Sequence, residues 1–413
     1  MPKAHITIPL DIPNVEVLKI ETTDKNEYII TVQSTRKRVR CRVCGSVLRK
    51  SHGYDDWITV QHVPILGHPV YLRFRPRRFE CDCAGNATTT EQLEWRDKHS
   101  PHSKAYDDHI LLQLVNATVQ DVHIKEGLHY AAVEGVIERR LVSEVDWSQY
   151  EVLGVLGLDE VALKKGHNDY VTLVTARLWD GRIAILGVLP GREKQTVKTF
   201  LTSIPARLHA TVHTVCTDMY AGYTEAAREV FPCALLVIDR FHVAKHYHGA
   251  ADALRIQVRK QLQKNLPEDE YAALKGNMWA FRKRPAELTC KERRGLKQLF
   301  AHAPDLKQAY DFRVQLTRIF DRNLSRSQAR KQIRSWMTRV RKSGLTCFDK
   351  FLNTLTHWFD EITNYFINRL SSGFVEGFNN KVKVLKRRCY GILNSRHLFQ
   401  RLWLDLNGYR LFA

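Results

Sequence analysis

The sequence predicts a multidomain α+β protein. Its 413 residues exceed the usual length of a single domain. Strand-like alternation dominates the N-terminal part, helical periodicity follows, and a mixed pattern of strands and helices begins near Trp147. A long stretch with almost no strand signal separates that mixed pattern from the C-terminal helices. We therefore expect five segments with these bounds: 1–100, 101–146, 147–244, 245–365 and 366–413.

Composition points to a polyanionic partner. The chain carries 64 Lys and Arg against 44 Asp and Glu, which gives a formal net charge of +20. The cations are spread along the chain and do not form a basic tail on a neutral protein. Charge of this size attracts polyanions, and nucleic acid is the partner it favours. A hydrophobic share of 44% excludes a disordered chain, because it is enough to build a core.

Hydropathy and cysteine usage favour a reducing, aqueous compartment. No run of about 18 apolar residues occurs, so no membrane span is expected. The N-terminal stretch MPKAHITIPLDIPN lacks the apolar core of a signal peptide. Apart from two close pairs, the cysteines stand alone in strand-like or helical patterns: Cys216, Cys233, Cys290, Cys347 and Cys389. Isolated thiols of this kind are typical of the cytosol.

Two close cysteine pairs in the N-terminal segment resemble a zinc ribbon. Residues 15–35 alternate as a β-hairpin, and Cys41 and Cys44 follow it. The stretch PVYLRFRPRRFE is a strand pattern interrupted by proline, and Cys81 and Cys83 follow that strand. Two such pairs predict a structural Zn²⁺ site, although the C-x-C spacing is unusually short. The alternative ligands, which are otherwise surface or packing residues, are His52, His62 and His68.

The next segment predicts three helices. An amphipathic helix at AYDDHILLQLVN precedes TVQDVHIKEGLHYAAVEGVIERRL, which predicts two helices joined at a glycine. This is the layout of a helix-turn-helix, whose second helix enters the DNA major groove. On this interpretation His129 and Tyr130 begin the recognition helix, and Arg139 and Arg140 contact phosphates. The alternative is a plain helical hairpin without DNA contacts.

The mixed segment predicts a sheet with helices on its faces. VLGVLGLDEVA is a buried-strand pattern that ends in Asp159 and Glu160, and the next two strands form a hairpin around an Asp-Gly turn. Two later strands end at Asp218 and Asp239, and a helix follows each of them. The order of three strands, helix, strand, helix, strand and helix predicts a mixed sheet.

The stretch SGFVEGFNNKVKVLKRRCYG predicts a helix with two unlike faces. At about 3.6 residues per turn, an apolar stripe forms from Val375, Phe378, Val382, Leu385 and Cys389. The opposite side holds Glu376, Asn379, Asn380, Lys383 and Arg387. One hypothesis is a metal-binding carboxylate beside a nucleic-acid backbone, with the amide and the cations as DNA contacts. The other is a basic surface helix with one incidental acid.

Three carboxylates from separated elements are candidates for one metal site. Asp159 and Asp218 end strands, where the binding groups of such sheets collect, and Glu376 comes from the helix above. Hard oxygen ligands suit Mg²⁺, and two ions about 4 Å apart can activate an attacking oxygen and stabilise a leaving one. Converging carboxylates repel one another, and a cation offsets that repulsion.

Several neighbours of these carboxylates have two interpretations. Glu160 points to the opposite face of its strand and is not expected to be a ligand. Asp239 either joins the site or, as we favour, caps the helix that follows it. His242 either helps to bind DNA or order the site, or packs in the core, which we favour. The turn after the first strand brings three residues to DNA phosphates or leaves them in a solvated loop: Lys164, Lys165 and His167.

Together these motifs resemble the ISL3 family of bacterial insertion-sequence transposases. The resemblance lies in GLDEVALKKGHNDY, VCTDMYAGY, VIDRFHVAKH, GNMWAFRKRPAEL and SGFVEGFNNKVKVLKRRCYG, which occur in the family's order over nearly the whole chain. It implies a zinc ribbon, a helix-turn-helix and an RNase H-like α/β catalytic core that an all-α insertion domain interrupts. It also implies a DDE triad at Asp159, Asp218 and Glu376. Related chains more often space the second cysteine pair more widely, and that departure concerns the zinc site.

The resemblance further implies a function. Such an enzyme binds the terminal inverted repeats of its insertion sequence, cleaves DNA with two Mg²⁺ or Mn²⁺ ions and transfers the freed strand to target DNA. Its partners are double-stranded DNA, both transposon ends and target, and other copies of itself. A homodimer or higher homo-oligomer on DNA is expected, because two ends must be brought together. The expected location is the bacterial cytoplasm, at the nucleoid.

Two other functions compete with this one. The chain could be a domesticated or regulatory DNA-binding protein with an inactive core. It could also be an RNase H-like structure-selective nuclease, which cuts DNA but does not join it. Two tryptophans in basic helices, Trp279 and Trp336, stack on distorted DNA ends or, as we favour, pack in the core.

Overall fold

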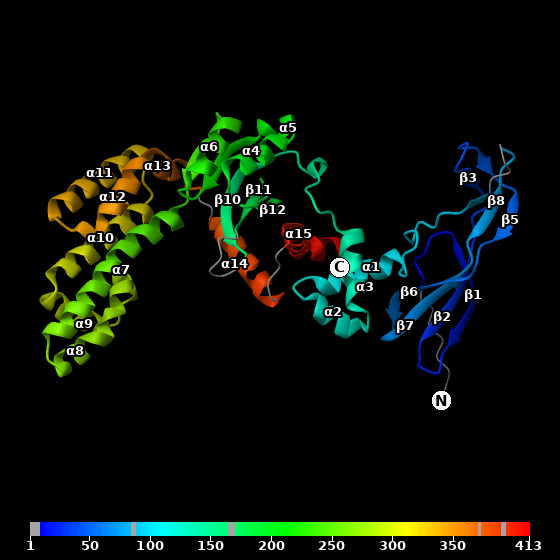
Figure 1. Ribbon diagram of the computed structural model, residues 1–413, viewed down its shortest axis with the longest axis horizontal. Coiled ribbons are helices and arrows are strands. Elements are labelled where there is room, and N and C mark those ends of the chain that lie inside the picture. Colours follow the sequence, from blue (N-terminus) through cyan, green and yellow to red (C-terminus); the bar gives the residue numbers. More distant parts are fainter. Residues whose placement is uncertain (1–8, 84–87, 164–169, 371–372, 390–393) are drawn as a thin grey trace. The chain divides into compact units, whose positions relative to one another are not determined.

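The chain forms two compact units. The computed structural model describes residues 9–83, 88–163, 170–370, 373–389 and 394–413, without the side chains of 373–376 and 379 (Figure 1). The first unit comprises Met1–Leu141 with Leu404–Ala413, and the second comprises Val142–Trp403. No described helix is both long enough and apolar enough to cross a membrane.

A four-stranded sheet forms the start of the first unit. Its strands are β1 (Val15–Thr22), β2 (Tyr28–Ser34), β6 (Ile58–Ile65) and β7 (His68–Phe74), in the order β1-β2-β7-β6. The predicted hairpin is confirmed, because β1 and β2 pair antiparallel. Alternate residues of these strands pack around Trp95 in a small core: Ile30, Val32, Val60, Val70, Leu72 and Phe74.

Short strands hold the cysteine pairs. They are β3 (Val39–Arg40), β4 (Val47–Leu48), β5 (Ser51–Tyr54), β8 (Arg77–Glu80) and β9 (Thr88–Thr90). β3 pairs with β4, and β8 lies between β5 and β9. The predicted interruption at Pro76 is confirmed: β7 ends before it and β8 begins after it. A proline cannot donate a ladder hydrogen bond, which explains the break.

Three helices complete this unit: α1 (Lys104–Leu114), α2 (Val119–Glu126) and α3 (Tyr130–Arg140). Thr118 and Asp121 form a capping box at the start of α2. Gly127 ends α2 with φ 64°, a left-handed conformation that glycine adopts without strain. The predicted turn between the second and third helices is therefore confirmed.

The second unit is built on a mixed sheet. Its strands are β10 (Gly154–Ala162), β11 (Tyr170–Arg177), β12 (Ile183–Pro190), β13 (Val212–Thr217) and β14 (Leu235–Ile238), in the order β12-β11-β10-β13-β14. β10, β11 and β12 pair antiparallel, whereas β13 runs parallel to both β10 and β14. This confirms the predicted mixed sheet.

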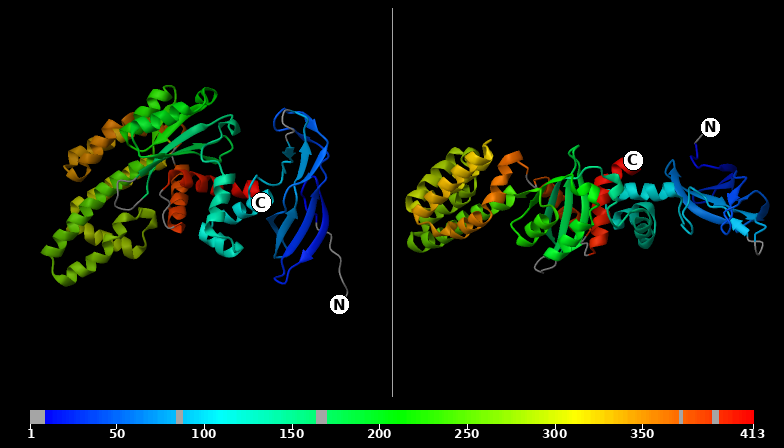
Figure 2. Two further views of the ribbon diagram at one scale, coloured as in Figure 1. Left: turned by 45° about the vertical axis from the view of Figure 1, so that its right-hand side comes forward. Right: turned by 90° about the horizontal axis from the view of Figure 1, so that it is seen from above.

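Helices cover both faces of this sheet (Figures 1 and 2). The helices between its strands are η1 (Trp147–Gln149) before β10, then α4 (Lys194–Ser203), α5 (Ala206–His209) and α6 (Ala221–Val230). Leu156 and Leu158 of β10 pack with α4 and α6 in one cluster. Val155 belongs to a second cluster on the other face, which includes residues of the long helix that follows β14.

An all-helical block follows the sheet, as predicted. It contains α7 (Arg240–Asn265), α8 (Glu268–Lys275), η2 (Gly276–Met278), η3 (Ala280–Arg282), η4 (Pro285–Glu287), α9 (Cys290–His302), α10 (Pro304–Asp321), α11 (Arg326–Ser343), η5 (Thr346–Phe348), α12 (Asp349–His357) and α13 (Phe359–Asn368). α7 continues without a break through residue 244, where a segment boundary was expected. The chain ends in α14 (Gly373–Arg388) and α15 (Ser395–Phe412).

The two tryptophans of the helical block have opposite environments. Trp336 of α11 is fully buried, and its indole N–H donates to the Phe312 carbonyl at 2.9 Å. The prediction of core packing is confirmed for this residue. It is wrong for Trp279, whose side chain lies at the surface with 64% exposed. Trp279 follows a short 3-10 turn, so a helical-periodicity argument does not apply to it.

We predict that Trp336→Ala lowers the free energy of unfolding of the helical block by about 3–5 kcal/mol, because it leaves a large cavity and removes the indole hydrogen bond to the Phe312 carbonyl. Denaturant-dependent hydrogen exchange of α10 and α11 amides measures the change. Trp179→Ala is the matched control, since Trp179 is 85% exposed and its loss should change stability by less than about 0.5 kcal/mol. Equal effects of the two substitutions would contradict the prediction.

Candidate active site and zinc centre

The register of β10 and β13 determines where two aspartates lie. The strands are parallel neighbours in which Gly157 is paired with Cys216. Asp159 lies two residues beyond Gly157, and Asp218 lies two residues beyond Cys216. Side chains two residues apart on a strand share a face, and neighbouring strands are about 4.8 Å apart. The two carboxylates are therefore neighbours on one face of the sheet.

Alternation places the aspartates on the face of the sheet that is opposite α4 and α6. Leu156 and Leu158 point toward α4 and α6, whereas Val155 points to the opposite face. Asp159 has the parity of Val155 and is 6% exposed. A carboxylate this buried requires compensation by hydrogen bonds or a cation. One oxygen accepts the backbone N–H of Glu160 at 2.7 Å.

Burial and neighbouring charges both shift the pKa of Asp218. Burial raises the pKa of Asp218 from the usual 3.8 to about 6, and the negative charges of Asp159 and Glu160 act in the same direction. His242 acts in the opposite direction but does not cancel this effect. The carboxylates thus converge at an electrostatic cost that a divalent cation would remove.

The start of α7 brings a histidine to the same face. Asp239 follows β14 and caps α7, because its carboxylate accepts the N–H of Phe241 at 3.1 Å. This confirms the capping role that we favoured from the sequence. The cap places His242 in the first turn, with its Nε2 3.9 Å from Asp159 Oδ1. Packing in the core was favoured for His242, but its side chain is 25% exposed and lies beside the aspartate. The sequence did contain a signal for this position of His242, since it follows the capping residue Asp239 by three residues, within one helical turn.

Glu160 is engaged elsewhere. Its carboxylate pairs with Arg192 at 3.0 Å, and the Arg192 guanidinium lies over the rings of Tyr170 and Tyr220 at 5.2 Å from each centroid. This ion pair agrees with the expectation that Glu160 is not a metal ligand. The sequence analysis did not identify Arg192, because the pair joins two different strand ends.

The helix α14 has the predicted two-sided character over its described side chains. Phe378, Val382 and Leu385 are buried, which confirms the apolar stripe at these positions. The predicted DNA contacts are exposed: Asn380, Lys383 and Arg387. Lys386 donates to the carbonyl of Ala162 at the end of β10, which attaches α14 to the strand that carries Asp159 (Figure 1).

Some predicted site residues lie outside the described part of the chain. Glu376 belongs to α14 through its backbone, but its side chain is not among those described. Lys164, Lys165 and His167 are not among the described residues either. The structure thus brings Asp159 and Asp218 together, while the roles of the other four residues stay predictions.

A second candidate centre lies in the first unit. The ligand atoms of Cys41, Cys44, Cys81 and Cys83 all lie within 4.8 Å of one another. Cys41 Sγ is 3.9 Å from Cys83 Sγ, and Cys44 Sγ is 3.6 Å from Cys81 Sγ. Tetrahedral zinc with Zn–S bonds of about 2.3 Å separates its sulfurs by about 3.8 Å. Four thiolates at these distances fit a structural Zn²⁺ ion, including the short C-x-C pair.

The three histidines considered as alternative ligands have other partners. His62 is buried and shares a hydrogen bond with Ser103 Oγ at 2.8 Å. His52 lies 3.7 Å from Glu80, and the ring of His68 packs edge-on against Tyr28. Four cysteines therefore complete the ligand set without a histidine. Backbone N–H groups of Cys44 and Val43 lower the pKa of the Cys41 thiol to about 6, which favours its thiolate.

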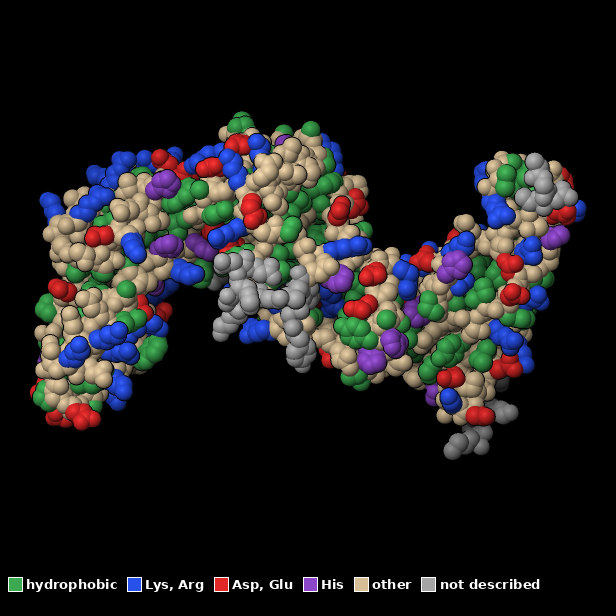
Figure 3. Space-filling model, viewed as in Figure 1, with side chains coloured by type: hydrophobic (Ala, Val, Ile, Leu, Met, Phe, Trp, Pro, Cys, Tyr) green, Lys and Arg blue, Asp and Glu red, His purple; other side chains and the backbone are tan. Residues whose placement is uncertain are grey.

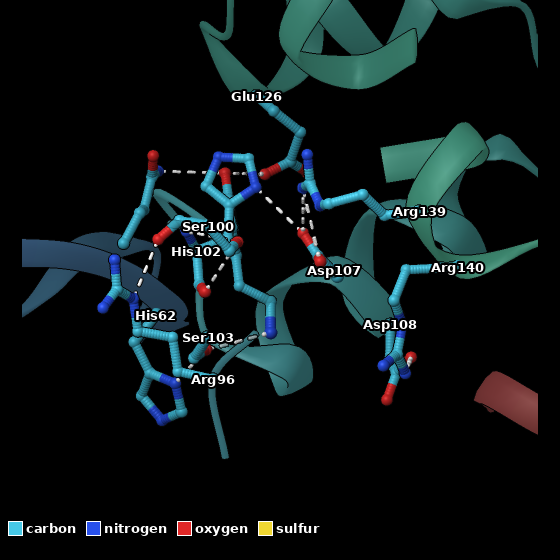
Figure 4. A network of polar contacts seen from close by, with 12 residues as sticks. His62, Arg96, Ser100, His102, Ser103, Asp107, Asp108, Glu126, Arg139 and Arg140 are labelled. Atoms are coloured by element: carbon cyan, nitrogen blue, oxygen red, sulfur yellow. Dashed lines mark hydrogen bonds and ion pairs between the residues drawn. The ribbon is translucent and has the colours of Figure 1, made fainter. Parts of the chain in front are cut away.

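The two ends of the predicted recognition helix differ in their contacts, and Figure 4 shows the end that carries Arg139 and Arg140. At its start His129 caps α3, with Nδ1 accepting the N–H of Ala131 at 3.3 Å, and Tyr130 is exposed. At its end Arg139 pairs with buried Asp107 at 3.2 Å, and Arg140 pairs with Asp108, both on α1. The sequence analysis assigned these two arginines to phosphates. Their observed contacts instead hold α3 to α1.

Asp107 is the centre of this network. Its Oδ1 also lies 2.9 Å from Nδ1 of His102, and both side chains are almost completely buried. Glu126 of α2 accepts from Tyr106 and lies 3.0 Å from Nε2 of His109, so all three helices share polar contacts. The polar network therefore fixes the packing of α1, α2 and α3.

Cations also gather on the helical block. Figure 3 shows Lys and Arg side chains along α11, at the upper left of that view. The exposed cations of this helix are Lys331, Arg334, Arg339, Arg341 and Lys342. Such a row adds to the electrostatic attraction of a polyanion.

Comparison with known proteins identifies the class of this fold. A family model described as a transposase matches residues 156–402. A second model, described as the zinc-finger of transposases IS204/IS1001/IS1096/IS1165, matches residues 37–83 and includes all four clustered cysteines. The sheet with its aspartates is therefore that of a transposase, and the cysteine cluster is a zinc ribbon. The chain belongs to the ISL3 family of transposases.

Curated relatives agree over most of the chain. The transposase of insertion sequence IS1001 from Bordetella parapertussis is 28% identical over 90% of both chains. The transposase of IS1557 from Mycobacterium tuberculosis is 24% identical over 96% of this chain and 93% of its own. A similar solved structure is the Drosophila P element transposase strand transfer complex, with a TM-score of 0.42 and 12% identity over 76% of this chain and 93% of that one.

We predict that the cysteine cluster binds about one zinc ion per chain and that Cys83→Ser lowers this content strongly, because tetrahedral zinc requires its fourth thiolate. Metal analysis of the purified protein measures the ratio. Cys290→Ser is the control, since Cys290 is exposed and lies outside the cluster. Full zinc content in Cys83→Ser would exclude the short pair as a complete ligand pair.

We predict that Asp218→Asn stabilises the metal-free protein at neutral pH. The raised pKa of Asp218 means that stability is lost as pH rises from about 4 to about 6, so the neutral amide should gain roughly 1–3 kcal/mol above pH 6 and little below pH 4. Thermal unfolding with a chelator at several pH values measures this. Asp180→Asn is a control of opposite sign, because the backbone N–H of Arg182 lowers the pKa of Asp180. A lower unfolding midpoint for Asp218→Asn at pH 7 would contradict the argument.

Proposed function

We propose that this chain is a DDE transposase that cleaves the ends of its insertion sequence and transfers them to target DNA. The observation that carries the proposal is the parallel register of β10 and β13, which sets the carboxylates of Asp159 and Asp218 side by side. The raised pKa of Asp218 supports a site whose charge is completed by cations. The strand order β12-β11-β10-β13-β14, interrupted before α14 by a helical block, supports an RNase H-like core with an inserted domain.

Each residue of the proposed active site has a distinct role. Asp159 and Asp218 present oxygen ligands from the sheet, and Glu376 of α14 completes the triad in this proposal. Two bound Mg²⁺ or Mn²⁺ ions would supply activation of the attacking oxygen and stabilisation of the leaving oxygen. Lys383 and Arg387, exposed on α14, bind phosphates of the DNA being cut. Water attacks the scissile phosphate and frees a 3′-hydroxyl, and this hydroxyl then attacks a phosphate of the target.

The first unit provides the recognition of DNA in this proposal. The zinc ribbon and helices α1–α3 bind the terminal inverted repeats, with His129 and Tyr130 at the exposed start of α3 facing the bases. Lys164 and Lys165 add phosphate contacts. Two ends are joined by a homodimer or larger homo-oligomer on DNA, and the charge of +20 favours a location at the bacterial nucleoid in the cytoplasm.

We predict that Asp159→Asn, Asp218→Asn and Glu376→Gln each abolish metal-dependent cleavage while end binding changes little, because the carboxylates act on the reacting phosphate through cations. A labelled duplex that carries the element's own end, incubated with Mg²⁺ or Mn²⁺, measures nicking, and a target plasmid measures strand transfer. Glu160→Gln is the adjacent control, since its carboxylate pairs with Arg192, and should keep cleavage within about tenfold.

Three outcomes would weigh against this proposal. Cleavage by Asp159→Asn at the rate of the unchanged chain would remove the residue from the active site. Tight end binding without cleavage by any form would favour a regulatory DNA-binding protein. Cleavage without strand transfer would favour a structure-selective nuclease.

A further inference from the structure

An alternating row of arginines and aromatic rings lies on the β domain of the first unit. The guanidinium of Arg73 lies 4.9 Å from the ring centroid of Trp57, and that of Arg75 lies 5.5 Å from the rings of both Trp57 and Tyr54. The guanidinium of Arg77 lies 5.9 Å from the ring of Tyr54. The order is thus Arg73, Trp57, Arg75, Tyr54 and Arg77, and we call this group the arginine ladder.

The local backbone explains the alternation. The arginines are spaced two residues apart on the extended chain that leaves β7, passes Pro76 and enters β8, so they project to one side. The two rings come from the end of β5 and the chain that leads into β6. The hydroxyl of Tyr54 also accepts from the Gln33 amide of β2 at 3.2 Å, which links the β5-β8-β9 sheet to the four-stranded sheet.

The cations of the ladder keep their charge available. In the described part of the β domain, ion pairs engage other cations, namely Arg36 with Glu94, Lys50 with Glu80 and Arg78 with Asp55. No carboxylate of that part pairs with an arginine of the ladder. Two of them donate to backbone carbonyls instead, Arg75 to Asp55 at 3.0 Å and Arg77 to Arg36 at 3.2 Å. Carbonyl acceptors orient a guanidinium without neutralising it.

The ladder is also accessible. Tyr54 and Trp57 are 41% and 49% exposed, and Arg73 and Arg75 are exposed. Single exposed aromatic side chains are common at protein surfaces, but these two lie next to each other and both contact Arg75. Here two guanidinium groups already lie over the ring of Trp57, so they compete with any nucleobase that would stack on it. The rings instead hold the arginines apart and restrict their rotamers.

Spacing favours a linear polyanion. Side chains two residues apart on an extended chain are about 6.6 Å apart, a step similar to that between successive phosphates of one DNA strand. Guanidinium groups bind phosphate oxygens with two parallel hydrogen bonds, and those that are already ordered lose less entropy on binding. An isolated small anion would need only one of the arginines.

We propose that the arginine ladder binds the sugar-phosphate backbone of double-stranded DNA and contributes affinity without reading sequence. The partner follows from the proposed function, in which the first unit binds DNA ends. All ladder residues fall within residues 37–83, which the zinc-finger model matches, so the ladder is a sequence-independent contact of the zinc-ribbon segment itself. It lies apart in sequence from α3 and from the aspartates, so its loss should leave base recognition and cleavage chemistry unchanged.

The test is the salt dependence of DNA binding by the full chain. The double variant Arg73→Ala with Arg75→Ala should lower the slope of log K against log salt by about 1.8, because each phosphate that is no longer neutralised accounts for about 0.9. The fall should be equal on a duplex with the element's end and on an unrelated duplex. Lys19→Ala with Lys50→Ala is the matched control, because it removes the same charge from the same domain but from lysines paired with Glu21 and Glu80.

A second variant protects the test against misfolding. Arg73→Gln with Arg75→Gln keeps long polar side chains and should give the same fall in slope. Zinc content equal to that of the unchanged chain reports that the β domain is folded. Trp57→Ala should weaken binding several-fold with a smaller change in slope, because it frees the arginines without removing their charge.

The possible results are distinct. An unchanged slope in both arginine variants, with normal zinc content, would overturn the ladder proposal. A fall in slope seen only with the duplex that carries the element's end would also overturn the ladder proposal. Such a result would indicate that the arginines contribute to the reading of bases. If the arginine variants show the expected fall in slope but the unchanged chain does not cleave DNA, the result would support the ladder. It would also count against the proposed enzyme.

Discussion

The parallel pairing of β10 with β13 is the interaction on which the arrangement of the second unit depends. It brings Asp159 of β10 and Asp218, which directly follows β13, to one face of the sheet. β10 is apolar toward α4 and α6 and packs on the second face as well, so its register is strongly constrained. A slip of one residue would exchange Asp159 for Glu160 and turn Leu158 out of its cluster. Hydrophobic packing on one face thus determines the geometry of charge on the other.

The same face carries an electrostatic cost that the surrounding elements do not remove. Burial and mutual repulsion raise the pKa of Asp218, and His242 offsets this only in part. The fold tolerates the cost because the sheet is stabilised elsewhere, through two hydrophobic clusters that share its strands. A cation bound between such carboxylates would remove this cost.

Sequence patterns predicted much of this architecture because local periodicity carries it. The strands that carry or precede Asp159 and Asp218, the cap at Asp239 and the buried stripe of α14 all follow from spacing along one element. The expected strand end at Asp159 is wrong, because β10 continues to Ala162, where it still pairs with β11. Contacts between elements were not predicted. Arg139 and Arg140 pair with α1, and a pattern on α3 alone gives no sign of that choice. The zinc ligands were predictable because two closely spaced cysteine pairs are a sequence signature of a zinc site.

The helical block illustrates why segment boundaries were harder to predict than elements. α7 begins at the sheet, where its first turn carries His242, and continues into the block, where Tyr247, Ala251 and Val258 join the core around Trp336. The helix has no proline, and its one glycine, Gly249, does not interrupt it, so the helical periodicity gives no sign of where the sheet segment ends and the helical block begins. One continuous helix therefore supports both a residue beside Asp159 and the packing of the helical block. The helical block shares one hydrophobic cluster with Val155, Cys216, Val237 and Ile238 of the sheet, so its stability and the geometry at Asp159 depend on the same helix.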